Sequence, residues 1–380
     1  MRRLTKIILI LTAVAFSLQS CREDQVIIGS VEGQVTDPVH GGSIAGFYHL
    51  NEGNMGMNKA SIDYFDYSTG IYAVNIYPER NPNVVKELGD VGNDIQIYGG
   101  KLYAVINASN KVEVMDVCTT KRIKLIDIPN CRYIVFNEGK AYVSSYAGPI
   151  AIDPNTPLGV VLEIDTATLE TTRRAVVGYQ PEEMVIRGNK LYVANSGGYR
   201  VPNYERTISV IDLDTFKEKE KIDVAINLHR MQIDKRGDIY VSSRGDYTNT
   251  GSKLYVIDTE TDKMKQELDI PVSNMTMVGD SLYYIGVSYS HNTGKNTTSY
   301  GILDTRTKRV ISDKIITDGT DKGIIIPYGI AVQPETKEIY ISDAQNYIVS
   351  GYVYCFTPEG KLKWKVMAGN IPGHFAFVNK

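Results

Sequence analysis

The chain has 380 residues, of which 43% are hydrophobic, and its 41 basic and 44 acidic side chains nearly balance. This length supports a large buried core, in one large domain or in two to three ordinary ones. Because the basic residues form no long run, the chain lacks the charge pattern of non-specific nucleic-acid binding, and we expect no nucleic-acid partner. Its four cysteines include no CxxC pair, which excludes a zinc ribbon, a thioredoxin-type motif and a disulfide-stapled scaffold.

The first 20 residues have the pattern of a signal peptide. A basic start, MRRLTK, precedes an apolar run over residues 7–18 that is too short to cross a bilayer as a helix. The run ends at Ser20-Cys21, which resembles a bacterial lipobox. We therefore expect cleavage after residue 20 and lipidation of Cys21, which makes the lipid the protein's only attachment to a membrane. An ordinary signal peptide with a cysteine at this place by chance is the alternative.

The residues that follow Cys21 are interpreted as a tether. The acidic pair Glu23 and Asp24 resembles the export signal that sends lipoproteins of some Gram-negative bacteria to the outer cell surface; a short solvated acidic stretch is the alternative. Residues 21–44 show no apolar period. We expect a lipidated N-terminus and tether over residues 21–44 and one domain over residues 45–380.

The body of the chain contains a repeat in which an alternating apolar strand ends in aspartate. Six copies occupy residues 62–66, 112–116, 161–165, 208–212, 254–258 and 300–304, and a degraded seventh occupies residues 352–356. The aspartates of successive copies are 46 to 50 residues apart. This period is close to that of a four-stranded propeller blade.

A second repeat places a tyrosine on the strand that precedes each of these segments. The seven tyrosines are Tyr48, Tyr103, Tyr142, Tyr192, Tyr240, Tyr283 and Tyr340. A side chain that recurs at one structural position is typical of packing between repeats, so we assign these tyrosines to the core.

Together the two repeats predict an all-β fold, a seven-bladed β-propeller with four short strands in each blade. Residues 374–378 match the first strand of a blade, whereas the domain begins near residue 46 with a second strand. We expect the C-terminal strand to pair with the N-terminal blade and close the ring. A ring of six or eight blades remains an alternative.

The connections differ in length between the two rims of the predicted ring. Turns between first and second strands are minimal, whereas the loops after the second strands are long and rich in Tyr, Asn, Ser and Gly. We call the side with these loops the long-loop rim. Binding residues concentrate on loops held by a rigid scaffold, and tyrosine offers broad contact area at small entropic cost.

Enzyme motifs are largely missing from the sequence. It contains no HExxH, GxSxG, GxxxxGK[ST] or GxGxxG, and its five histidines have no metal-ligand spacing. We expect no catalysis, no metal and no cofactor. A polar ring around the propeller axis is the opposing feature, because it could hold calcium as in lactonase-like propellers. Its members open the first strands: Asp94, Arg132, Glu182, Glu183, His229, Arg230, Asn274, Tyr328 and His374.

The candidate ligand-binding residues combine this ring with the long-loop rim. They are Asn51, Asp94, Arg132, Tyr146, Tyr179, Asn195, Tyr199, Arg200, His229, Arg244, Asp246, Tyr247, Tyr289, Tyr328, Asp343, Asn346 and Tyr347. The three cysteines of the domain, Cys118, Cys131 and Cys355, are expected to be free and mostly buried, since about seven extended residues separate the first two by roughly 20 Å.

The blade motifs resemble the YncE-like propeller lipoproteins. They are Val-Ile-Asp-Thr-Glu-Thr at residues 256–261 and Lys-Leu-Tyr-Val at residues 190–193, and the segment Leu-Asn-Glu-Gly-Asn at residues 50–54 further resembles the surface cobalamin-binding members of that group. The resemblance implies a protein anchored on the cell surface at the outer membrane. It also implies capture of cobalamin (vitamin B12) or related corrinoids and delivery to a TonB-dependent outer-membrane transporter.

Other functions fit the same rim. A surface glycan-binding lipoprotein that feeds a saccharide transporter is the leading alternative, because tyrosines and amides suit sugars equally well. A lactonase-like hydrolase and a pure interaction scaffold follow. The resemblance assigns no individual ligand contact, so the candidate residues rest on the rim argument.

Overall fold

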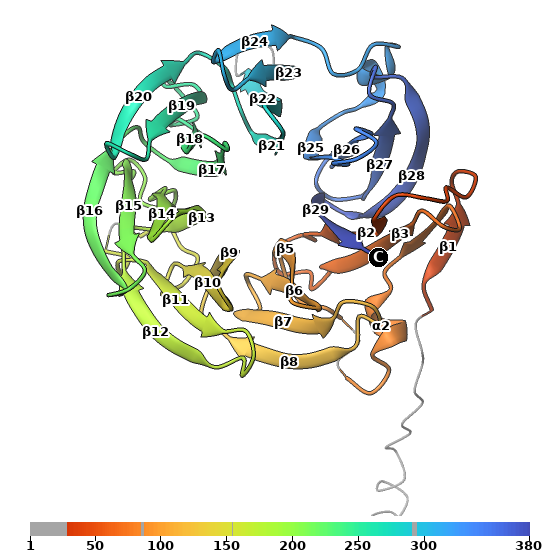
Figure 1. Ribbon diagram of the computed structural model, residues 1–380, viewed down its shortest axis with the longest axis horizontal. Helices are drawn as coiled ribbons and strands as arrows, with labels where there is room; N and C mark the ends of the chain where they lie inside the picture. Colours follow the sequence, from red (N-terminus) through yellow and green to blue (C-terminus); the bar gives the residue numbers. More distant parts are fainter. Residues whose placement is uncertain (1–28, 85–86, 154, 291–294) are drawn as a thin grey trace, which may run out of the picture.

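The computed structural model describes residues 29–84, 87–153, 155–290 and 295–380. Seven antiparallel sheets stand in a ring around a central axis (Figure 1). The predicted seven-bladed β-propeller is therefore confirmed. The helices of the described residues are short: α2 (Tyr77–Arg80) and the 3-10 helix η1 (Thr320–Gly323). No described helix has the length and apolar character needed to cross a membrane.

Blades 2 to 7 each consist of four consecutive strands, ordered from the axis outward. Their strands are β5 (Gly92–Tyr98), β6 (Lys101–Ile106), β7 (Lys111–Asp116) and β8 (Arg122–Asp127); β9 (Cys131–Asn137), β10 (Lys140–Ser145), β11 (Val160–Asp165) and β12 (Thr171–Val176); β13 (Pro181–Arg187), β14 (Lys190–Asn195), β15 (Thr207–Asp212) and β16 (Lys217–Asp223); β17 (Leu228–Ile233), β18 (Asp238–Ser243), β19 (Lys253–Asp258) and β20 (Lys263–Leu268); β21 (Asn274–Val278), β22 (Ser281–Ser290), β23 (Lys295–Asp304) and β24 (Arg309–Ser312); and β25 (Pro327–Val332), β26 (Ile339–Asp343), β27 (Ser350–Phe356) and β28 (Leu362–Asn370).

Blade 1 joins the two ends of the chain. Its strands, from the axis outward, are β29 (Pro372–Asn379), β2 (Ile44–Asn51), β3 (Ser61–Asp66), β4 (Ile71–Val74) and β1 (Val31–Gln34). The C-terminal β29 pairs antiparallel with β2, with Phe47 opposite Phe377. This pairing covers the inner edge of β2, which would otherwise be open, and it confirms the predicted closure of the ring by the C-terminal strand.

The outermost strand of blade 1 differs from the prediction. Residues 31–34 were expected in the tether, but they form β1 and pair with β4, with Val31 opposite Val74. All four side chains of β1 are exposed. The strand therefore needs no alternation of apolar and polar residues, which is why the pattern did not reveal it. Cys21 and the predicted signal peptide lie outside the described residues.

The repeated aspartate closes the turn between the third and fourth strands. In blade 2 the Oδ1 atom of Asp116 accepts hydrogen bonds from the backbone amides of Cys118 and Thr119 at 3.1 and 2.8 Å. Asp165 and Asp258 each accept two backbone amides in the same way. A carboxylate that replaces backbone acceptors in a tight turn explains the recurrence of aspartate at this position.

The repeated tyrosines connect neighbouring blades, as predicted. The hydroxyl of Tyr48 donates to the carbonyl of Val117 in blade 2 at 2.6 Å, and that of Tyr240 donates to the carbonyl of Thr305 in blade 6 at 3.1 Å. Six of the seven tyrosines are buried, and Tyr283 is half-buried. The rings thus fill space between blades, and the hydroxyls of Tyr48, Tyr192 and Tyr240 each donate to a carbonyl of the next blade.

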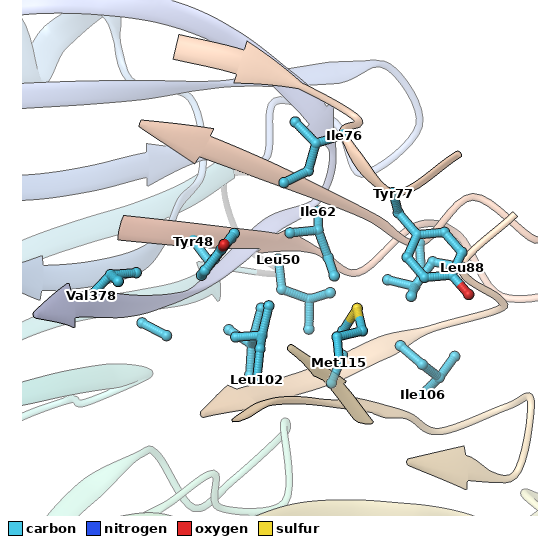
Figure 2. Packing of buried hydrophobic residues seen from close by; sticks show 14 of the residues in the cluster. Tyr48, Leu50, Ile62, Ile76, Tyr77, Leu88, Leu102, Ile106, Met115 and Val378 are labelled. Atoms are coloured by element: carbon cyan, nitrogen blue, oxygen red, sulfur yellow. The ribbon is translucent and has the colours of Figure 1, made fainter. Parts of the chain in front are cut away.

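The core lies between the blades rather than in one central layer. Between blades 1 and 2, side chains from β2, β3, β6, β7 and the segment after β4 interdigitate (Figure 2). Leu50, Ile62, Leu102 and Met115 are fully buried there. Truncating such a leucine to alanine typically costs about 2–5 kcal/mol, so each interface of this kind fixes the relative position of two blades.

The three cysteines of the domain are free, as predicted. Cys131 and Cys355 are buried, whereas Cys118 is exposed. The expectation of burial was wrong for Cys118 because it lies in the turn that Asp116 closes, at the surface of the outer strands.

Candidate functional site

The two rims differ as the sequence predicts. Two residues join β5 to β6, β9 to β10, β13 to β14 and β21 to β22, whereas residues 146–159, 196–206 and 244–252 form long connections after second strands. Gly245 shows how tightly these loops fold back. Its φ is +67°, and a Cβ atom there would lie 1.9 Å from the carbonyl oxygen of Thr250. Only glycine fits such a close approach of backbone to backbone.

A pocket of about 270 Å³ opens at the axis on the long-loop rim, and we call it the rim pocket. Inner strands and long loops line it, with Arg132, Arg230 and Arg244 in its wall. A larger groove of about 580 Å³ lies between the outer strands of blades 1 and 7. We take the rim pocket as the candidate site despite its smaller size. Three arginines, three tyrosines, a glutamate and a histidine from five blades converge there, whereas the larger groove is lined by outer segments of two blades.

Bulges at the start of the inner strands turn side chains toward the axis. The pairing of β13 with β14 shifts register between Pro181 and Met184, and that of β17 with β18 shifts between Leu228 and Met231. The intervening pairs, Glu182-Glu183 and His229-Arg230, are left outside the regular ladder. Bulges commonly redirect side chains at functional sites in this way.

The carboxylate of Glu182 is the centre of a buried polar network. It accepts two hydrogen bonds from Arg132, at 3.0 and 2.9 Å, through one oxygen. The other oxygen accepts the Tyr146 hydroxyl at 2.6 Å and lies 3.4 Å from Arg244 Nη1. Although burial opposes ionisation, the Arg132 and Arg244 guanidiniums hold the pKa of Glu182 below its usual range. One charged carboxylate thus ties blades 3, 4 and 5 together below the pocket.

His229 is held as a neutral side chain. Burial lowers its pKa well below the usual value, and the nearby guanidiniums of Arg244, Arg230 and Arg132 add to the shift. Its Nε2 atom lies 2.9 Å from the hydroxyl of Tyr133. This ring nitrogen therefore forms a hydrogen bond with a residue of the pocket wall.

The opposite wall comes from blades 7 and 1. Both carboxylate oxygens of Glu52 are engaged there: one accepts the Tyr328 hydroxyl at 2.9 Å, and the other lies 3.0 Å from His374 Nε2. The rim pocket thus has a wall with three arginines on blades 3 and 5, and a wall on blades 7 and 1 that carries one carboxylate, Glu52.

Glu183 forms an ion pair with Arg230 at 3.8 Å, and its pKa provides a test of how the axial environment affects a carboxylate. Burial raises its pKa to about 7, against the opposing charge of Arg230. Since this folded-state value exceeds the unfolded value of about 4.3, the folded protein holds the proton more tightly, and ionisation of Glu183 reduces stability as the pH rises from about 4.5 to about 7. Glu183→Gln, which cannot ionise, should lose less stability over this range than the wild type, by about 1–3 kcal/mol. Urea unfolding at pH 5, 6, 7 and 8 measures the two slopes; identical slopes would contradict the assignment.

Five of the predicted site residues line the rim pocket: Arg132, Tyr199, His229, Arg244 and Tyr328. Others border them. The ring of Tyr347 contacts Tyr328 edge to face at 5.9 Å between centroids. Tyr146 lies buried below Tyr199, with 6.3 Å between ring centroids.

Further predicted residues shape the rim loops around the pocket. Arg200 stacks 3.7 Å from the ring centroid of Tyr179. The carboxylate of Asp246 accepts three backbone amides in its own loop, and these bonds, the one from Thr250 first, lower its pKa to about 2. Asn346 is exposed and accepts two backbone amides in the loop after β26 of blade 7, residues 344–349. Tyr247 is 60% exposed at the tip of the Asp246 loop.

Several predicted residues lie inside the scaffold instead of lining the pocket. Asn51, Asn195 and Asp343 are fully buried. Their side chains bond to Ser61, to Thr207 and Ser209, and to the backbone amides of Ile325 and Ile326, respectively. Asp94 is buried in β5 and accepts the amide of Ile134 from blade 3 at 3.0 Å. Tyr289 belongs to β22, and its side chain lies outside the described part of the structure.

The candidate set omitted residues that the structure places in the pocket wall. Glu52 and Tyr133 were not selected, and Arg230 was noted only as a member of the axial ring. The available signal was the paired polar residues at the openings of the inner strands. Tyr133 follows Arg132 as Arg230 follows His229. Both members of each pair lie at the opening of an inner strand, so the sequence pattern predicts both of them near the axis.

Comparisons with solved structures show the same fold. A hypothetical selenium-binding protein from Sulfolobus tokodaii has a TM-score of 0.64 at 10% identity, with 89% of this chain and 94% of that chain covered. A quinonprotein alcohol dehydrogenase-like protein from Bacteroides thetaiotaomicron has a TM-score of 0.57 at 13% identity, with coverages of 88% and 78%. Apo AztD from Citrobacter koseri has a TM-score of 0.53 at 11% identity, with coverages of 88% and 98%.

No curated protein matches the chain in sequence. A family model described as a domain of unknown function, DUF5074, matches residues 45–366. This match spans nearly the whole propeller, and the chain therefore belongs to the DUF5074 family.

Proposed function

We propose that this protein captures cobalamin or a related corrinoid on its long-loop rim and passes it to a TonB-dependent outer-membrane transporter. The observation that carries the proposal is the clustering of exposed tyrosines around the rim pocket. Tyr199, Tyr247 and Tyr347 are 37%, 60% and 39% exposed, and they come from loops of blades 4, 5 and 7. Rigid aromatic rings around a polar pocket suit a broad, flat ligand that has an apolar face and a polar edge.

A corrin macrocycle has these properties. It is flat, and its edge carries amide groups that both donate and accept hydrogen bonds, which Asn346 and the loop backbones can complement. A pocket of about 270 Å³ is small for the whole macrocycle. The ligand therefore lies across the rim, with one of its groups in the pocket.

The sequence resemblance supports the choice of ligand and place. The segment Leu-Asn-Glu-Gly-Asn at residues 50–54 resembles the cobalamin-binding lipoprotein BtuG. Its Glu52 and Gly53 start the loop after β2, and both lie in the wall of the rim pocket. The lipobox at Cys21 supports attachment to the outer membrane at the cell surface.

Substitutions on the rim test this proposal. Tyr199→Ala, Arg200→Ala, Tyr247→Ala and Tyr347→Ala are each expected to weaken cyanocobalamin binding about 5- to 50-fold, as loss of exposed aromatic or arginine contacts at a binding surface does. Titration calorimetry measures the affinity, and thermal unfolding should show nearly the wild-type midpoint. Val310→Ala, on the exposed outer strand β24, is the control and should leave both unchanged.

Three outcomes would contradict the proposal. Equal loss of folding and binding would place these side chains in the core. Unchanged affinity in all four variants would remove the long-loop rim from the binding site. Wild-type protein that ignores corrinoids but binds a polysaccharide would replace this proposal with glycan capture.

A further inference from the structure

The three arginines of the rim pocket differ in how far the protein satisfies them. Arg132 makes two hydrogen bonds to Glu182. Arg230 is only 6% exposed, yet its Nε atom has no hydrogen-bond partner among the described residues. Its nearest ion-pair contact is Glu183, at 3.8 Å, and its guanidinium carbon lies 5.3 Å from the ring centroid of Tyr133.

Arg244 also has hydrogen-bond donors that the protein satisfies poorly. It has a partly exposed side chain, and its contact with Glu182 is long, at 3.4 Å, on an oxygen that already accepts the Tyr146 hydroxyl. Arg230 and Arg244 both come from blade 5 and both line the pocket. Two guanidiniums with open donors therefore share one wall.

Leaving such donors unbound is costly. A guanidinium carries five N–H donors, and a buried charged group without hydrogen bonds loses the solvation it had in water. Removing polar partners from a buried donor typically costs more than the bond itself contributes. The open donors of Arg230 thus indicate a partner that belongs to the ligand.

The surrounding charges select the chemistry of that partner. His229 is neutral and adds no charge. The carboxylate of Glu52 is engaged by Tyr328 and His374 on the opposite wall, and Glu182 is shared between Arg132 and Arg244. Glu183 and Asp94 accept backbone amides of the next blades, Met231 and Ile134. A planar guanidinium fork matches a phosphate or a carboxylate best, because two parallel N–H···O bonds form at once.

We propose that Arg230 and Arg244 bind an anionic oxygen group of the captured ligand, a phosphate or a carboxylate. The inference rests on the proposed function only for the source of that group. In cobalamin the group is the phosphodiester that joins the corrin side chain to the nucleotide, and cobinamide lacks it. The rest of the macrocycle then lies on the tyrosines of the rim.

The first arm of the test uses inorganic phosphate alone. The wild-type protein is expected to bind phosphate, measured by titration calorimetry at low ionic strength, and Arg244→Gln is expected to weaken binding about 10-fold or more, as loss of a charge-assisted hydrogen bond does. Arg206→Gln is the matched control, since Arg206 is an exposed arginine paired with Asp223 outside the pocket. It should bind phosphate as the wild type does.

The second arm compares cyanocobalamin with cobinamide. The wild type is expected to prefer cyanocobalamin about 10- to 100-fold. Arg244→Gln, and the charge-balanced double variant Arg230→Gln with Glu183→Gln, should reduce this preference toward unity while cobinamide affinity stays the same. The double variant avoids leaving Glu183 as an unpaired, partly buried carboxylate, and Arg244→Gln alone keeps the test open if the double variant fails to fold.

The outcomes separate the two proposals. Phosphate binding that depends on Arg244, without any corrinoid binding, supports the anion site and overturns cobalamin capture. Corrinoid binding with the same cobalamin preference in every variant supports capture and overturns the anion site. Absence of phosphate binding in the wild type, together with equal affinity for cobalamin and cobinamide, also overturns the anion site.

Discussion

Glu182→Gln is expected to lower the free energy of unfolding by about 3–5 kcal/mol, because it removes the charge that compensates a buried arginine. Glu182 is fully buried and accepts hydrogen bonds from Arg132 and Tyr146. Glutamine has nearly the same shape, so the loss reports the charge and not a cavity. Chemical unfolding monitored by circular dichroism measures the difference.

Two variants control this measurement. Glu260→Gln changes an exposed carboxylate in the turn after β19 and should change stability by less than about 0.5 kcal/mol. Adding Arg132→Met to Glu182→Gln removes the uncompensated charge and should recover part of the loss. A loss below about 1 kcal/mol for Glu182→Gln would show that the pair does not hold blades 3 and 4 together.

Deletion of residues 372–380 is expected to abolish cooperative unfolding. These residues form β29, the innermost strand of blade 1, which pairs with β2 along its length. Without it, Phe47 and His49 lose Phe375, which lies 5.5 and 4.3 Å from their ring centroids. The edge of β2 would then face water, and β25 of blade 7 would lose the strand that it packs against, so the ring would have no closed form.

Deletion of residues 29–34 is the matched control, because it removes β1 from the other edge of the same sheet. All four side chains of β1 are exposed, and the loss should stay within about 1 kcal/mol. Ala376→Asp keeps the chain length and places a charge on a buried position of β29, so it should be strongly destabilising. Thermal unfolding that stays cooperative after loss of β29 would contradict closure by this strand.

The fold could be predicted from the sequence because two side chains, an aspartate and a tyrosine, recur in the blades for structural reasons. Each repeated aspartate caps a turn, and most of the repeated tyrosines fill an interface between blades. Such positions tolerate few replacements, so the period survives in one sequence. β1 was missed because an exposed edge strand needs no apolar pattern.

Only part of the site could be predicted from the sequence. The polar pairs that open the inner strands were visible in the sequence, but their partners were not, since Glu182 meets Arg132 and Arg244 across 50 and 62 residues. Asn51, Asn195 and Asp343 have the composition of a binding loop, yet they are buried. Short amide and carboxylate side chains bond to nearby backbone and hydroxyl groups as readily as to a ligand. Only the folded structure distinguishes bonding inside the protein from bonding to a ligand.

Direct binding is the simplest test of corrinoid capture. Residues 22–380, prepared without the lipid, would be mixed with cyanocobalamin and separated by gel filtration, and the affinity measured by titration calorimetry. We expect the red chromophore to elute with the protein at one molecule per chain. A chromophore that elutes entirely with the free ligand, with no heat of binding, would contradict it.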